Sequence, residues 1–212
     1  MEQPTYPIQY SVDYPDRMLD RLRTFFRIFM VIPILIVLGT VSGSTSTWES
    51  TTGSDTTLIS TGAGGILFFG PLLMILFRQK YPRWWFDWNL ELQRFSNRVG
   101  AYLALMDDRY PSTDDHQSVH LDYVYPDAQR DLNRWLPLVK WFLAIPHYIV
   151  LILLNIAAIV VVIVAWFAIL FTGHYPRGMF GFVEGVIRWN NRVVGYVLTL
   201  VTDQYPPFSL SA

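Results

Sequence analysis

Four runs of apolar residues dominate the hydrophobic pattern of the chain, at about 25–41, 62–78, 136–154 and 156–173. A bilayer core roughly 30 Å thick needs about 20 apolar residues per helix, so each run suits a short transmembrane helix. The pattern predicts an all-α membrane protein in which four transmembrane helices form two tandem helical hairpins. We expect the first run to be an anchor and not a cleaved signal peptide, because a long charged segment precedes it.

The two hairpins lie in two copies of one sequence unit. Tyr-Pro-Asp, Ile-Pro, Tyr-Pro-Arg, Asn-Arg-Val and Tyr-Pro recur in this order, at 14–16, 32–33, 81–83, 97–99 and 110–111, and again at 125–127, 145–146, 175–177, 191–193 and 205–206. Such ordered self-similarity indicates an internal repeat. We therefore expect a first repeat at 1–112 and a second at 113–212.

The first copy holds 19 extra residues, which coincide with the Ser/Thr-rich segment 42–61. Without this insertion, two apolar helices joined by a tight turn remain, which predicts a bend near Asn155 in the second copy. Basic residues, Arg27 and Lys140 among them, flank the predicted hairpins on one side and are absent from 42–61. The positive-inside rule then places both termini and the 79–135 connection in the cytoplasm, with the 42–61 loop outside.

An amphipathic helix is predicted after each hairpin, at 83–106 and 177–202, because apolar side chains recur there at three- and four-residue spacing. Each is expected to lie in the membrane interface. The side chains that suit lipid or partner binding are Trp84, Trp85, Trp88, Arg94, Arg98, Arg188 and Arg192. The arginines either form ion pairs within the helices and snorkel, or bind lipid phosphate or a partner's acidic groups.

Two short segments alternate between apolar and polar residues in the manner of strands. Ile8–Tyr14 and Val119–Tyr125 occupy matching places in the two copies, which favours pairing between them in the cytoplasm. In the outer loop, the Thr-rich residues 44–60 with a central Thr-Gly-Ser suit a β-hairpin.

Composition and motifs give little indication of a catalytic, metal-binding or cofactor site. The chain is 52% hydrophobic and 16% charged with a net charge of −1, which is unlike a soluble domain or a nucleic-acid-binding protein. It has no cysteine, phosphate loop or nucleophile elbow, so we expect no enzyme, no metal site and no cofactor. His147 lies inside a predicted span, where it either satisfies a carbonyl freed by Pro146, binds a pigment or haem, or relays a proton.

Several motifs of the second copy resemble one family. They are Arg134–Pro137, Trp141–Tyr148, Trp166–Gly173, Tyr175–Gly178 and Arg192–Phe208. They are similar to the bacterial membrane proteins of domain-of-unknown-function family 4389. The first copy matches at its landmarks but departs at 42–61 and at Trp84-Trp85. The resemblance implies the bacterial cytoplasmic (inner) membrane and implies no activity.

The sequence therefore favours a non-catalytic accessory or scaffold subunit of a larger membrane protein assembly. Its expected partners are membrane lipids and either other membrane subunits or further copies of itself, without nucleic acid. A lipid-handling or small-solute transport protein is the alternative, because helices broken at Pro33 and Pro146 suit the frame of a transport path. A pigment- or haem-binding subunit that uses His147 is the third hypothesis.

Overall fold

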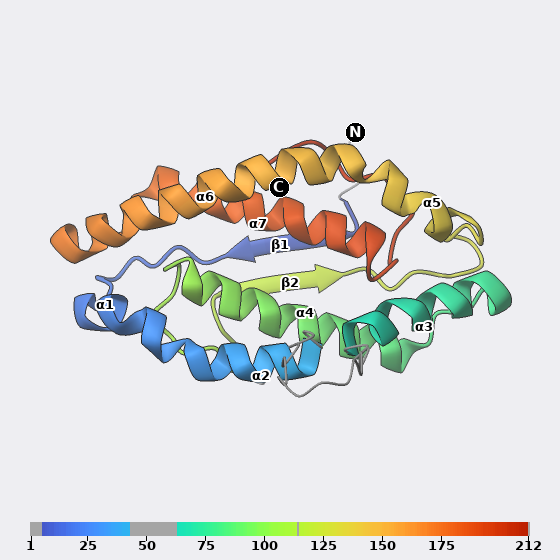
Figure 1. Cartoon of the computed structure of the whole chain (residues 1–212), viewed down its shortest axis with the longest axis horizontal. Helices are drawn as coiled ribbons and strands as arrows, with labels where there is room; N and C mark the ends of the chain where they lie inside the picture. The colour runs from blue at the N-terminus through green and yellow to red at the C-terminus, as the bar shows by residue number, and fades with distance from the viewer. Residues whose placement is uncertain (1–5, 43–62, 114, 212) are drawn as a thin grey trace, which may run out of the picture.

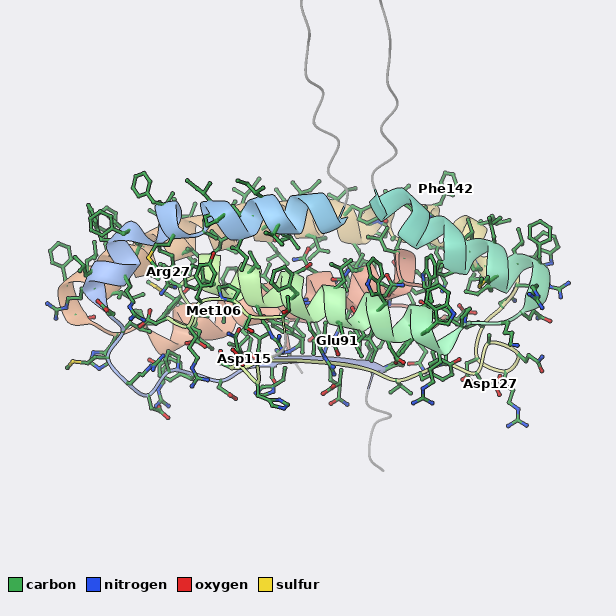
Figure 2. The ribbon with its side chains drawn as sticks, turned by 90° about the horizontal axis from the view of Figure 1, so that it is seen from below. Arg27, Glu91, Met106, Asp115, Asp127 and Phe142 are labelled. Atoms are coloured by element: carbon green, nitrogen blue, oxygen red, sulfur yellow. The ribbon has the colours of Figure 1, made fainter. Side chains whose placement is uncertain are left out.

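The chain folds into three layers, and the computed structural model describes residues 6–42, 63–113 and 115–211. The first layer holds the apolar helices α1 (Arg21–Met30), α2 (Ile32–Ser42), α3 (Ala63–Arg78), α5 (Leu136–Leu143) and α6 (Ile145–Thr172). The second holds the amphipathic helices α4 (Arg83–Leu103) and α7 (Arg177–Val197), and the third holds the strands β1 (Ile8–Val12) and β2 (Val119–Tyr123). Figure 1 looks down through the layers, and Figure 2 shows them from the side, with the apolar helices uppermost.

The predicted pairing of the two extended segments is confirmed. β1 and β2 are antiparallel, with Tyr10 opposite Leu121, and alternate residues of each strand are buried. α4 packs on β2 and α7 packs on β1, so each amphipathic helix covers the strand from the other half of the chain. The segments 1–112 and 113–212 consequently share one core, to which Ile8, Leu90 and Val186 all contribute.

Both predicted amphipathic helices are present, but they end earlier than expected. Leu105 and Leu200 have φ angles of 65° and 55°, in the left-handed region that costs an L residue roughly 1–2 kcal/mol. A wide backbone turn surrounds each leucine. The Met106 N–H donates to the Ala101 carbonyl, and the Val201 N–H donates to the Gly195 carbonyl. Both leucines are buried, so packing holds this conformation.

The prediction of four transmembrane helices is wrong. α6 is one continuous helix of 28 residues that runs through the expected bend at Asn155. The Asn155 amide donates to the Leu151 carbonyl at 2.7 Å and pairs with Asn190 of α7, so the neighbouring helix satisfies the polar side chain and no turn forms. Among the described residues, two segments, Arg21–Gly39 and Ile145–Thr172, are long and apolar enough to cross a membrane.

Two short helices of the first layer, α2 and α3, stand on either side of the predicted insertion. α2 contains 11 residues and α3 contains 16, so their combined length is close to the 28 residues of α6. The two helices flank residues 43–62. The hairpin predicted in the second half was wrong because residues 42–61 were taken as a loop between two spans. A shorter turn was then expected at the same place in the second half. The expected β-hairpin at 44–60 lies outside the described residues.

A left-handed glycine ends α6 and gives a test of this geometry. Gly173 has φ 75°, and its N–H bonds to the Ile169 carbonyl. We predict that Gly173→Ala lowers the free energy of unfolding by about 1–2 kcal/mol, because a side chain is strained at this φ. The measurement is unfolding of the protein in detergent, followed by circular dichroism.

Gly178→Ala in the first turn of α7 is the control, because an added Cβ there meets no atom within 4 Å. This variant should be at least as stable as the wild type, since alanine favours helix. Equal losses in the two variants would contradict the left-handed helix end.

Candidate functional site

The outer surface of the first layer is a continuous apolar face. On α6, the exposed side chains include Ile149, Ile156 and Ile163, which are 60%, 56% and 53% exposed, while Leu151 and Ala165 on the opposite side are buried. Only 17% of the most apolar part of α6 is buried, so this helix is not the core helix of a soluble protein. Further exposed apolar residues from the other helices of the layer are Phe25, Phe26, Ile28, Phe29, Ile32, Leu35, Ile36, Leu73, Phe77, Leu138 and Phe142.

Charged groups gather on the opposite side of the molecule. In Figure 2, Phe142 points outward from the apolar layer, whereas Asp115 and Asp127 lie on the side of the strands. There, exposed His120 of β2 lies 3.0 Å from the Asp13 carboxylate. The molecule is thus amphipathic as a whole, because one broad face is apolar and the other is polar.

A buried arginine ties the first layer to the second. Arg27 of α1 is 2% exposed and forms an ion pair with Asp108, which follows α4. Its guanidinium also donates to the Tyr102 carbonyl at 2.9 Å and lies 4.5 Å from the centre of the Tyr102 ring. A buried cation is stabilised only when such partners compensate for its lost hydration.

A buried lysine makes the corresponding contacts in the second half. The Lys140 ammonium of α5 lies 2.7 Å from a carboxylate oxygen of Asp203 and 4.8 Å from the centre of the Tyr196 ring. It donates to the Thr202 carbonyl at 2.7 Å, and the side chain is fully buried. Arg27 and Lys140, which were counted among the basic residues that flank the predicted hairpins, both turn inward to acids that follow the amphipathic helices.

The four candidate arginines of the amphipathic helices contact the chain itself. The Nε atoms of Arg94 and Arg188 donate to carbonyls of the strands, at Leu121 and Tyr10, each at 2.8 Å. Arg94 also pairs with Glu91 and Asp122, and Arg188 pairs with Glu184.

Arg98 and Arg192 bind the segments that follow their helices. Arg98 donates to the carbonyls of Ser112 and Thr113, and Arg192 donates to those of Ser209 and Ser211. Burial lowers the pKa of Arg192 below its ordinary value, and the charge of Arg188 adds to this. These contacts join the layers and the tail, while the Arg94 side chain stays 28% exposed.

The three candidate tryptophans lie in the first turns of α4. Trp84 and Trp88 are 64% and 45% exposed. Trp85 instead packs on Gly70 of α3, where an added Cβ would lie 2.6 Å from the indole. Trp84 and Trp88 thus keep the exposure that suits an interfacial aromatic residue, whereas Trp85 joins two helices.

His147 is enclosed by aromatic residues. Its ring stacks on Phe208 with 4.0 Å between centroids, and the Trp189 indole donates to its Nδ1 at 3.0 Å. Nδ1 accepts this bond, so the neutral ring carries its proton on Nε2, which is buried and has no partner in the described part of the chain. Residues 6–42, 63–113 and 115–211 contain no cluster of three or more His, Asp or Glu suited to a metal ion.

A cavity of about 310 Å³ lies between α1 and α6. Its lining comes from the apolar residues Ile28, Leu103, Leu105, Val162, Ile163, Trp166 and Phe167, together with Thr24 and Arg27. Sequence reasoning missed this site, because the cavity is formed by a tertiary contact between α1 and α6 that no local pattern reveals. A matching cation at Lys140, equally spaced from the following Ile-Pro, was the signal available.

Comparison with known proteins identifies one domain. Residues 135–209 match the family described as domain of unknown function DUF4389. This stretch runs from the start of α5 past α7 and includes Lys140, His147 and Asp203. The resemblance seen in the sequence is therefore confirmed for the second half of the chain. No curated protein and no solved structure matches the chain.

The buried cations give a second prediction. Arg27→Met and Lys140→Met each leave a carboxylate buried without its partner, so each should lower the free energy of unfolding by about 3–5 kcal/mol. Arg23→Met is the control, because Arg23 pairs with Asp20 while 63% of its side chain is exposed. Thermal unfolding in detergent measures all three, and an equally large loss for Arg23→Met would contradict the assignment.

Proposed function

We propose that this protein is a non-catalytic accessory or scaffold subunit that is embedded by its apolar face in one leaflet of a membrane. The one-sided exposure of apolar side chains carries the proposal, because large contiguous apolar surface marks a membrane or protein contact. In this arrangement the helices of the first layer lie among acyl chains, α4 and α7 lie near the headgroups, and the strands face water.

The packing favours helices that lie in the membrane plane over helices that cross it. α6 packs along α7, and α7 contacts β1, so a crossing α6 would carry both elements into the hydrocarbon. Glu184 and Arg188 of α7 and the exposed strand residue Asp122 would then enter the bilayer, where ionised groups are costly. Lying flat, the same molecule leaves these groups outside the hydrocarbon.

The proposal includes two tandem copies of one unit. Residues with an unusual burial or backbone conformation support this, because they occur in pairs at matching places in the two sequence units. The pairs are the buried cations Arg27 and Lys140, the left-handed residues Gln79 and Gly173, and the left-handed leucines Leu105 and Leu200. Asn97 and Asn191, which also match, donate to each other at 2.8 and 2.6 Å. Such contact between equivalent residues suits a local two-fold axis, which would run along the membrane normal.

We place the protein in the bacterial cytoplasmic membrane, with both termini on the cytoplasmic side. The two ends of the described chain lie close together. The Tyr6 hydroxyl donates to the Gln204 carbonyl at 3.1 Å, and Arg192, whose guanidinium lies 5.7 Å from the Tyr6 ring centre, binds Ser211. The two ends of the described chain therefore lie on the same side of the molecule. The positive-inside rule assigns the side with exposed basic residues to the cytoplasm, which favours the cytoplasm for both ends.

Acidic substitutions on the apolar face test the membrane contact. We predict that Ile156→Asp reduces the fraction of protein bound to vesicles of phosphatidylethanolamine and phosphatidylglycerol at least tenfold, because an aspartate among acyl chains costs about 2.5–3.5 kcal/mol. Detergent dilution into vesicles followed by flotation measures the bound fraction. Val124→Asp is the control, since Val124 is 62% exposed and follows β2 on the polar side.

The apolar-face proposal fails if both variants float like the wild type, or if Val124→Asp is impaired as strongly as Ile156→Asp. Circular dichroism confirms that each variant is folded before flotation.

The scaffold role has a separate test. The chain has no cysteine, so His120→Cys and Ile156→Cys place one crosslinking group on the polar and apolar faces. After extraction from the native membrane with surrounding lipid, the polar-face group should crosslink reproducibly to the same polypeptide. A monomer that crosslinks to nothing from either face contradicts an accessory subunit.

Lipid handling remains a second candidate function, and the cavity between α1 and α6 favours it. That cavity combines an apolar lining with two polar side chains.

A further inference from the structure

Two hydrogen-bond donors that the protein does not use belong to side chains that line the cavity between α1 and α6. Thr24 Oγ1 and Arg27 Nε are shielded from solvent, and neither has a hydrogen-bond partner in the described ranges of the chain. The two side chains are only 1% and 2% exposed, and both line the cavity. Buried donors without partners cost about 1–3 kcal/mol each, and native proteins rarely keep them.

The two terminal nitrogens of the Arg27 guanidinium already have hydrogen-bond partners, which limits the kinds of ligand that the cavity can bind. One terminal nitrogen binds the Tyr102 carbonyl and the other binds the Asp108 carboxylate. Because Asp108 already balances the positive charge, an anion in the cavity would gain little from Arg27 and would be repelled by that carboxylate. A neutral oxygen that accepts a hydrogen bond fits better than a phosphate or a carboxylate.

The lining defines the rest of the occupant. Ile28, Ile163 and Phe167 line the cavity and are also exposed on the apolar face, so the cavity is continuous with that face. A volume of about 310 Å³ is at the lower end for ligand pockets and suits one section of a longer apolar molecule. The rest of such a molecule can extend along the apolar face among the surrounding acyl chains.

The second half of the chain lacks these groups. By the spacing of Pro33 and Pro146, the positions that match Thr24 and Arg27 are Pro137 and Lys140. Proline has no hydroxyl, and the Lys140 ammonium reaches Thr202 and Asp203. The unused donors therefore do not follow from the shared architecture of the two halves, which favours a specific role in the first half.

We infer that the cavity between α1 and α6 binds a neutral, long-chain molecule through a carbonyl oxygen that accepts hydrogen bonds from Thr24 and Arg27. This inference rests on the proposed membrane embedding, since the ligand enters from the apolar face. A lipid acyl ester and an isoprenoid-type quinone both have this chemistry, because each joins a carbonyl to a long apolar chain.

Native mass spectrometry of the detergent-solubilised protein tests the inference with two probes, dioleoylglycerol and decylubiquinone. At least one probe should saturate at one molecule per chain. Ile163→Trp, which fills the cavity, should weaken that binding at least tenfold, and Thr24→Val should weaken it about two- to tenfold through the lost hydrogen bond. Ile159→Trp is the matched control on the same helix, because Ile159 is 61% exposed and does not line the cavity.

Saturation by decylubiquinone alone identifies a quinone site, and saturation by dioleoylglycerol alone identifies an acyl-ester site. The inference is overturned if neither probe saturates, or if Ile163→Trp binds as well as Ile159→Trp. Flotation of the same variants separates this from the proposed function: normal vesicle binding without saturable probe binding refutes the cavity alone, whereas loss of wild-type flotation refutes the membrane embedding.

Discussion

Two buried cations hold the apolar helices against the polar half of the molecule. α6 is joined to α7 by the hydrogen bonds of Asn155 with Asn190 and of Trp189 with His147. Lipid is as apolar as leucine, so burial of apolar surface gives little reason for α1 and α5 to stay on the layer beneath them inside a membrane. Arg27 and Lys140 supply that reason, because each leaves an apolar helix to meet a carboxylate and a tyrosine ring beneath it. The layered arrangement, and with it the flat apolar face, depends on these contacts.

Hydrogen bonds within the protein also engage the arginines of the second layer. Arg94 and Arg188 bind strand carbonyls, and Arg98 and Arg192 bind the segments that follow the helices. Interaction with the surroundings then involves the apolar face, the exposed tryptophans, the outer side of the strands and exposed acids of α4 such as Glu91. This division of surfaces fits a subunit that is anchored by one face and presents the other.

Sequence periodicity predicted the strands and both amphipathic helices, because alternation and a helical repeat are local patterns. The spans were harder, since a long apolar run does not reveal whether it bends. Asn155 suggested a turn, but its satisfaction by Asn190 is a tertiary contact that the sequence does not display. For the same reason the sequence showed Arg27 only as one of the basic residues that flank the hairpins, and Thr24 was not noticed. Hydropathy measures how apolar a segment is and does not say whether the segment crosses or lies along a bilayer.

The depth of α6 in the bilayer tests the central claim most directly. Ile149, Ile156 and Phe167 are exposed on one side of this helix, and single cysteines at these positions accept a spin label without competition from native cysteines. Relaxation by oxygen and by a water-soluble nickel chelate then gives the depth of each label in reconstituted vesicles. Labels on a helix that lies in the membrane plane should share one depth to within about 5 Å. A progression of about 27 Å from position 149 to position 167, as the helical rise requires for a crossing helix, would contradict the account.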